Sequence, residues 1–186
     1  RDWDCELVTD CEDVENRWDL RLGEAPMDLS IQAGAYQAEY DFGGLSLTRL
    51  TIRDGAADVD LDFSAPNPVE MTMLRYETGA SSVSLHGLSN ANFDSMEFNG
   101  GAGDYTLDFS GDLQREAHVS IQAGVSSVTL IIPDGLAVEI TVEGGLSNVS
   151  YGSGWEEDDN VYTQAGSGPS LTIVIEIGAG NLNITH

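Results

Sequence analysis

Aspartates that alternate with apolar residues are the side chains in this sequence best suited to chemistry. They lie in two segments of the same pattern, Val59-Asp-Leu-Asp-Phe and Tyr105-Thr-Leu-Asp-Phe. Because successive side chains of a β-strand point to opposite faces, the apolar residues of these segments are expected to face a core. The acidic residues inside and beside the segments then face outward, and they are Asp58, Asp60, Asp104 and Asp108.

Three interpretations of these four aspartates compete. Carboxylate oxygens are the ligands that calcium prefers, so the aspartates could bind Ca²⁺. Asp58 and Asp104 could instead be the acid and base of an inverting glycosidase, if two strand spacings of about 4.8 Å separate them. The third interpretation is a solvated acidic face without a ligand. The sequence favours the third, because no basic residue accompanies the aspartates and the nearby aromatic residues are in core register.

Two further pairs of residues invite a functional interpretation. Cys5 and Cys11 are the two cysteines of the chain, and with five residues between them they could close a small disulfide loop of the kind found in oxidising compartments. Two free thiols are the alternative. Trp155 and Tyr162 flank an acidic insertion, where they could anchor a binding partner or simply pack within the fold.

A short glycine-centred phrase returns about every 22 residues along the chain, and the four aspartates lie within copies of it. An apolar strand pattern leads into the glycine, and small residues followed by a second apolar strand pattern come after it. A fixed period of this length is typical of proteins that stack identical units. The clear copies are centred on Gly55, Gly79, Gly101, Gly124, Gly145 and Gly178, with a degenerate copy at Gly34.

Period-two alternation of apolar and polar residues predicts strands with one buried face, and no segment has a convincing helical period. The fold class is therefore all-β. We expect a β-solenoid of about seven single-stranded coils of roughly 22 residues, with a β-sandwich of hairpins that turn at the glycines as the alternative. Residues 1–17 are expected to be an acidic leader or N-terminal cap. Residues 18–186 are expected to form the solenoid, with an inserted loop at 152–170.

Copies of the phrase alternate in type along the chain. Asp58 recurs as Asp104, 46 positions later, whereas Ser82 recurs as Ser127, 45 positions later. If the copies stack in sequence order, Ser82 lies between the two aspartates, which separates like charges that would otherwise repel each other.

The charge of the chain excludes several classes of partner. There are 32 acidic residues against seven basic residues, all of them arginine, and the net charge is −25. Nucleic acids and anionic membrane surfaces are disfavoured, because contacts to phosphate require clustered cations. No run of apolar residues approaches the roughly 18 that a membrane span needs.

The repeats resemble the toast-rack family of bacterial secreted and envelope proteins. Similar repeats occur in related adhesin-type domains and in the C-terminal domain of cell-wall-active antibiotic response proteins. This resemblance implies a short right-handed β-helix outside the cytoplasm, and it brings no catalytic motif with it. The segments that carry it include Asp28-Leu-Ser-Ile-Gln-Ala-Gly-Ala, Gly101-Ala-Gly-Asp-Tyr-Thr-Leu-Asp-Phe-Ser-Gly and Ala123-Gly-Val-Ser-Ser-Val-Thr-Leu-Ile-Ile-Pro.

We therefore expect a non-enzymatic, extracytoplasmic interaction module of adhesin-like character, secreted or attached to the cell surface. The expected partner is a protein or a cell-surface glycan, with a homo-oligomer as a further expectation. No cofactor is expected, calcium being the exception that the acidic face suggests. The alternative is a polysaccharide-active or calcium-dependent carbohydrate-binding β-helix that uses the same acidic face.

Overall fold

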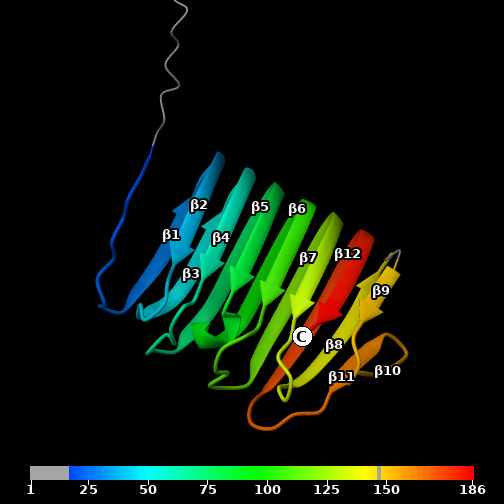
Figure 1. Cartoon of the computed structure of the whole chain (residues 1–186). Helices are drawn as coiled ribbons and strands as arrows, with labels where there is room; N and C mark the ends of the chain where they lie inside the picture. The colour runs from blue at the N-terminus through cyan, green and yellow to red at the C-terminus, as the bar shows by residue number, and fades with distance from the viewer. Residues whose placement is uncertain (1–16, 146–147) are drawn as a thin grey trace, which may run out of the picture.

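A computed structural model describes residues 17–145 and 148–186 and shows an all-β chain (Figure 1). Within these residues there is one short 3₁₀-helix, Leu88–Ala91, and no helix long and apolar enough to cross a membrane. The strands are β1 (Met27–Gln32), β2 (Ala35–Asp41), β3 (Leu47–Arg53), β4 (Ala56–Asp62), β5 (Met71–His86), β6 (Phe93–Asp108), β7 (Ala117–Ile131), β8 (Ala137–Gly144), β9 (Asn148–Tyr151), β10 (Glu156–Asp158), β11 (Val161–Gln164) and β12 (Ser170–Thr185).

Each repeat contains two strand segments joined at a bend, and we call them its first arm and its second arm. In β5, β6, β7 and β12 the two arms form one continuous strand of 15 or 16 residues. In the other repeats the arms are the separate strand pairs β1 and β2, β3 and β4, and β8 and β9. First arms pair with first arms and second arms with second arms, so the repeats stack side by side (Figure 1).

Pairing between neighbouring repeats is parallel throughout the described part of the stack. Antiparallel pairing among the described strands joins β10 to β11 and β11 to β8. The glycines are therefore bends within a repeat rather than the turns of antiparallel hairpins, and the predicted alternative of a β-sandwich of hairpins is wrong.

The predicted assignment of core and surface faces is confirmed. Val59, Leu61 and Phe63 are at most 2% exposed, and Tyr105, Leu107 and Phe109 are at most 1% exposed. These side chains lie between the two arms, where burial of apolar area is the main stabilising contribution.

The carboxylate of Asp54, in the bend between β3 and β4, is hydrogen-bonded to side chains of the neighbouring repeats. Asp54 accepts hydrogen bonds from the hydroxyls of Tyr76 (2.8 Å) and Tyr36 (3.3 Å), and also from Thr78. Burial, followed by hydrogen bonding to Asp54, raises the pKa of Tyr76 above its ordinary value. The hydroxyl therefore stays protonated and remains a donor to the carboxylate.

The stacking order differs from the sequence order at the C-terminal end. β12 lies between β7 and the repeat formed by β8 and β9, with parallel pairing on both sides. A stack of seven coils in sequence order would have placed β12 outermost. That part of the prediction is wrong, because after β9 the chain forms the β10–β11 hairpin on the outer side of β8 and then enters the sheet between β7 and β8 as β12.

Glycine and serine alternate along the row of residues that follows the bend. The row runs Ser81, Gly103, Ser126 and Gly180 through β5, β6, β7 and β12. Gly103 has φ +154° and Gly180 has φ +141°, and a Cβ at either position would overlap the carbonyl oxygen of the neighbouring serine. Glycine at these two positions therefore lets the backbone of β6 and β12 lie close to the carbonyl oxygens of Ser81 and Ser126.

The stack begins at Met27 rather than at Trp18. Residues 17–26 contain no assigned strand, and Trp18 and Leu20 are each 74% exposed. The alternating pattern at 18–22 predicted a strand, but a strand also needs a partner edge, and these residues do not pair with one.

Acid is expected to destabilise the turn after β2 through Asp41. Its carboxylate accepts hydrogen bonds from the Ser64 hydroxyl (2.7 Å) and from the Gly43 N–H (2.8 Å), which lower its pKa. The ionised form therefore stabilises the fold above the ordinary aspartate pKa of about 3.9, and this stabilisation is lost as pH falls toward the lower folded value.

The measurement is the thermal midpoint of the wild type and of Asp41→Asn between pH 7 and pH 2. We expect the variant to be less stable at neutral pH and the two curves to converge in acid. Glu39→Gln, an exposed change on the same strand, is the control. A constant difference between wild type and Asp41→Asn over the whole range would contradict the prediction.

Candidate interaction face

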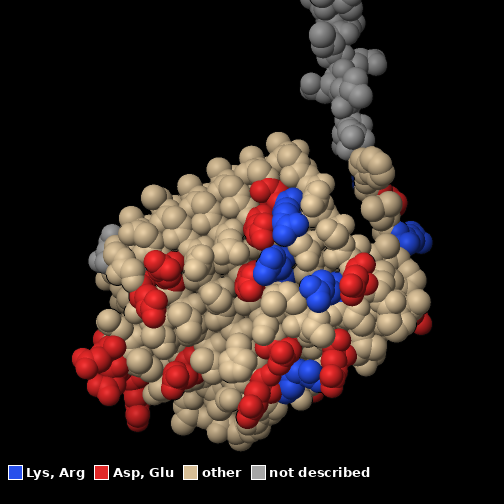
Figure 2. All heavy atoms as spheres, turned by 180° about the vertical axis from the view of Figure 1, so that it is seen from behind, with Lys and Arg blue, Asp and Glu red and all other residues tan. Residues whose placement is uncertain are grey.

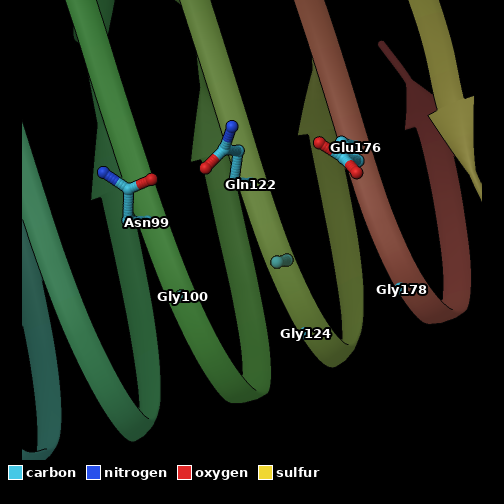
Figure 3. Close-up of a pocket in the computed structure, with 7 residues that line it drawn as sticks. Asn99, Gly100, Gln122, Gly124, Glu176 and Gly178 are labelled. Carbon is cyan, nitrogen blue, oxygen red and sulfur yellow. The ribbon is translucent and has the colours of Figure 1, made fainter.

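A row of polar side chains crosses the outer face of the first arms. It contains one residue from each of β3, β5, β6, β7 and β12, and these residues are direct partners in the parallel register. Figure 3 shows the last three side by side, projecting from the same face of adjacent strands. We call this set the polar row, and its members are Arg53, Glu77, Asn99, Gln122 and Glu176.

Ion pairs organise one end of the polar row. Arg53 Nε lies 2.7 Å from a carboxylate oxygen of Glu77, and Arg75, which faces outward nearby, lies 2.5 Å from Glu97 and 3.9 Å from Glu77. Figure 2 shows basic and acidic side chains clustered together on one face of the stack. Hydrogen-bonding groups at this end are thus partly used within the protein, whereas the amides of Asn99 and Gln122 are not engaged in these ion pairs.

Two adjoining depressions lie along the polar row. The first, of about 440 Å³, is lined by Arg75, Glu77, Glu97, Asn99, Ser120 and Gln122. The second, of about 330 Å³, is lined by Asn99, Gln122, Glu176 and small residues at the bends. Gly100, Gly124 and Gly178 also line this depression, below the three polar side chains (Figure 3). Asn99 and Gln122 belong to both depressions, which therefore form one continuous polar surface.

The charge state of Glu77 bears on the chemistry of this surface. Its hydrogen bond to Arg53 lowers the pKa of the carboxyl group. A general acid in glycoside hydrolysis needs the opposite, a raised pKa that keeps the carboxyl protonated near neutral pH. The arrangement around Glu77 is therefore suited to binding and unsuited to proton donation.

The aspartates singled out from the sequence lie on the other outer face, that of the second arms. Ser82 pairs with both Asp58 and Asp104, so the two carboxylates are separated by a full strand as predicted. His86 lies between two further carboxylates, with Nε2 3.9 Å from Asp60 and Nδ1 3.7 Å from Asp108. The acidic face is thus spaced by serine and interrupted by histidine.

The residues described, 17–145 and 148–186, contain no group of three or more His, Cys, Asp or Glu side chains placed to hold one metal ion. Asp58, Asp60, Asp104 and Asp108 therefore do not converge on a calcium site. The physical reason is the strand spacing, since carboxylates in alternate strands are too far apart to share one ion with bond lengths of about 2.4 Å. Cys5 and Cys11 lie outside the described residues.

Trp155 and Tyr162 are buried, which favours the predicted alternative that they pack within the fold over the alternative that they anchor a partner. Trp155 is 9% exposed and Tyr162 is 5% exposed. The predicted loop at 152–170 instead contains the β10–β11 hairpin, which packs along β8. The hydroxyls of Tyr162 and Tyr151 both donate to Glu157, at 3.3 and 2.6 Å. The aromatic residues therefore secure the hairpin that covers this end of the stack.

The polar row was not identified from the sequence, although a signal for it exists. Every copy of the repeated phrase has a large polar residue two positions before its glycine. The aspartates considered above follow the glycine, whereas the residues of the polar row precede it. The seven residues are Gln32, Arg53, Glu77, Asn99, Gln122, Glu143 and Glu176.

Stacked parallel repeats with a polar outer face and a covered end define the class to which the protein belongs, that of β-repeat proteins. The chain belongs to the toast-rack family. The family described as the N-terminal domain of toast_rack (DUF2154) matches residues 6–85 and, a second time, residues 66–131. Two overlapping matches are what the internal repetition of this chain would produce.

A solved structure supports the fold. The crystal structure of a putative cell adhesion protein from Clostridium sporogenes matches with a TM-score of 0.53 and 18% identity, covering 87% of this chain and 92% of that chain. At this identity the likeness shows the fold alone. The comparison with curated proteins gives no match.

Proposed function

We propose that this protein is a non-enzymatic, extracytoplasmic interaction module that binds a hydroxyl-rich glycan through the polar row. The carrying observation is that Asn99, Gln122 and Glu176 project side by side into two adjoining depressions. A carboxamide both donates and accepts hydrogen bonds, and a carboxylate accepts them, so the three residues complement sugar hydroxyls.

A glycan suits this face better than a peptide strand does. The backbone of β6, β7 and β12 is paired with a neighbouring strand on both sides, so the face offers side chains and no free strand edge. Peptides that add to a sheet need such an edge. The larger depression is lined by charged and polar side chains, which suits hydroxyl groups better than a hydrophobic side chain.

Two further considerations support a surface role. The family resemblance implies a short right-handed β-helix outside the cytoplasm, and the similar solved structure is that of a putative cell adhesion protein. The net charge of −25 keeps such a repetitive β-protein soluble and discourages association of like surfaces.

The test is a screen of bacterial polysaccharides and cell-wall fragments for binding, followed by calorimetry on any ligand found. Asn99→Ala combined with Gln122→Ala is expected to raise the dissociation constant at least about tenfold, which corresponds to about 1.4 kcal/mol. Asn148→Ala combined with Asn181→Ala makes the same chemical change on the second-arm face and is expected to leave binding unchanged.

Three outcomes would contradict the proposal. Equal effects of the two double variants would place binding elsewhere. Cleavage of a polysaccharide that is lost in Asp104→Asn would support the enzymatic alternative. Binding that is abolished by a chelator and restored by Ca²⁺ would support the calcium-dependent alternative.

A further inference from the structure

We propose that the N-terminal end of the stack is an interface through which two copies of this chain pair end to end about a two-fold axis. The end consists of β1 and β2. Each pairs with one described strand, β1 with β3 and β2 with β4. The opposite edge of each strand is therefore free among the residues that the structure describes.

The free edges carry backbone groups that can pair. Met27 and Ala33 donate their N–H groups toward the β3 side, to Ser46 and Arg53. Because backbone groups of a strand alternate in direction, the intervening residues Asp28, Ser30 and Gln32 direct theirs to the free edge. An unpaired strand edge of this kind is a template for pairing with another chain.

The core reaches the surface at this end. Leu29, Ile31, Tyr36, Ala38 and Tyr40 are only partly buried. The counterparts of Leu29, Ile31, Ala38 and Tyr40 one repeat further in are at most 2% exposed, and they are Leu50, Ile52, Val59 and Leu61. A second copy placed against the end would bury the same apolar side chains that the next repeat buries elsewhere in the stack.

The two ends of the stack are different, which decides the kind of assembly. At the other end, β11 and β10 continue the sheet beyond β8 in antiparallel fashion and cover its edge. Among the described strands, the short strand β9 pairs with β12 alone, so the hairpin covers the first-arm edge of this end. Head-to-tail stacking would place β1 of one copy against this antiparallel hairpin instead of against a parallel first arm. Pairing of two open ends instead uses the same surface on both copies and closes at a dimer.

Strand direction makes the two-fold arrangement self-complementary. β1 runs toward the bend at Gly34, and β2 runs away from it (Figure 1). A two-fold axis through this bend, bisecting the arms, places β1 of one copy antiparallel to β2 of the other copy. Both free edges are then paired, and the apolar faces of all four strands lie on the inner side.

Charge at the open end is mixed. The outward residues of its strands include Asp28, Glu39 and Asp41, and the exposed segment that precedes β1 carries two arginines and two acids, Arg17, Asp19, Arg21 and Glu24. Figure 1 shows this segment beyond β1, at the same end of the stack. The net charge of −25 on each copy opposes association over a longer range, so salt is expected to strengthen the dimer by screening that repulsion.

The first test is the solution mass of the full chain by analytical ultracentrifugation. We expect a dimer of two 19.9 kDa chains, favoured by 0.5 M salt. Ala38→Lys at the open end is expected to raise the dissociation constant at least about tenfold. Val149→Lys, on the short edge strand β9 at the other end, is the matched control and should have no effect. A monomer under all conditions, or a continuing series of larger species, would overturn the proposal.

The second test does not depend on how well a lysine variant folds. Gly34→Cys, with Cys5→Ser and Cys11→Ser, places one thiol beside the proposed axis. A Cβ at Gly34 would meet no atom within 4 Å. Mild oxidation is expected to give a disulfide-linked dimer in high yield. Ser153→Cys in the same background tests the covered end and should link poorly. Equal yields from the two variants would contradict the two-fold arrangement.

Discussion

Deleting β12 is expected to abolish cooperative folding, whereas deleting the last coil of a sequential stack would only shorten it. β12 pairs with β7 along its whole length and with β8 and β9 on its other side. A chain that ends after Gln164 would leave these strands with unpaired edges facing an empty slot. The measurement is thermal and chemical denaturation followed by circular dichroism, and we expect no cooperative transition.

Adding β12 back as a separate peptide shows whether the truncated chain fails to fold only because this strand is missing. A synthetic peptide of residues 170–185 is expected to restore a cooperative transition to the truncated chain, because it can occupy the space between β7 and β8. A truncated chain that unfolds cooperatively without the peptide would contradict the central role of β12.

Two matched substitutions within β12 test, in the full chain, whether this strand is buried between β7 and β8. Ile175→Ala removes a fully buried side chain between β7 and β8 and is expected to cost about 2–5 kcal/mol of unfolding free energy. Val174→Ala, at a position that is 39% exposed, is expected to change it by about 0.5 kcal/mol or less. Equal effects would mean that β12 does not separate β7 from β8 in solution.

Placing a side chain at Gly103 or Gly180 is expected to cost about 3 kcal/mol or more of unfolding free energy. Two causes combine, the positive φ angles of +154° and +141° and the overlap of a Cβ with the carbonyl oxygens of Ser81 and Ser126. The neighbouring strand cannot move away, because it is held by parallel pairing along both arms. Urea denaturation of Gly103→Ala and Gly180→Ala measures the cost.

Ser126→Ala is the control for the glycine variants. It lies in the same row, between Gly103 and Gly180, but its backbone already accommodates a Cβ. Its hydroxyl has no hydrogen-bond partner among the described residues, so its removal should change stability little. If Gly103→Ala were as mild as Ser126→Ala, close approach of the bends would not be the reason for glycine at this position.

Local chemistry made much of the fold predictable. Alternation correctly assigned Val59, Leu61 and Phe63 to the core, because side-chain direction in a strand depends only on residue parity. The period of the repeated phrase correctly placed Ser82 between Asp58 and Asp104, because parallel strands of equal length stack in register. Both inferences need only neighbouring residues and a fixed period.

The candidate site was less predictable. The polar row combines residues that are more than 20 positions apart, and each depression is lined by residues from three different strands. Burial of Trp155 and Tyr162 depends on where the hairpin packs, and the exposure of Trp18 depends on which edge is available to pair. These properties arise from contacts between distant segments, which residue types alone do not specify.

The sequence by itself determined the strands, their faces and the period at which they stack, since these follow from side-chain alternation and from glycine at the bends. Only the tertiary structure decided the order, in which β12 enters between β7 and β8. A trace of that order is nevertheless present in the residue types. In sequence order two serine-containing phrases, Gly124-Val-Ser-Ser and Gly145-Leu-Ser-Asn, follow one another, whereas β12 with its Gly178-Ala-Gly-Asn enters between their repeats, so that Gly180 pairs with Ser126. The physical reason for glycine there is steric, because a Cβ at position 180 would overlap the carbonyl oxygen of Ser126.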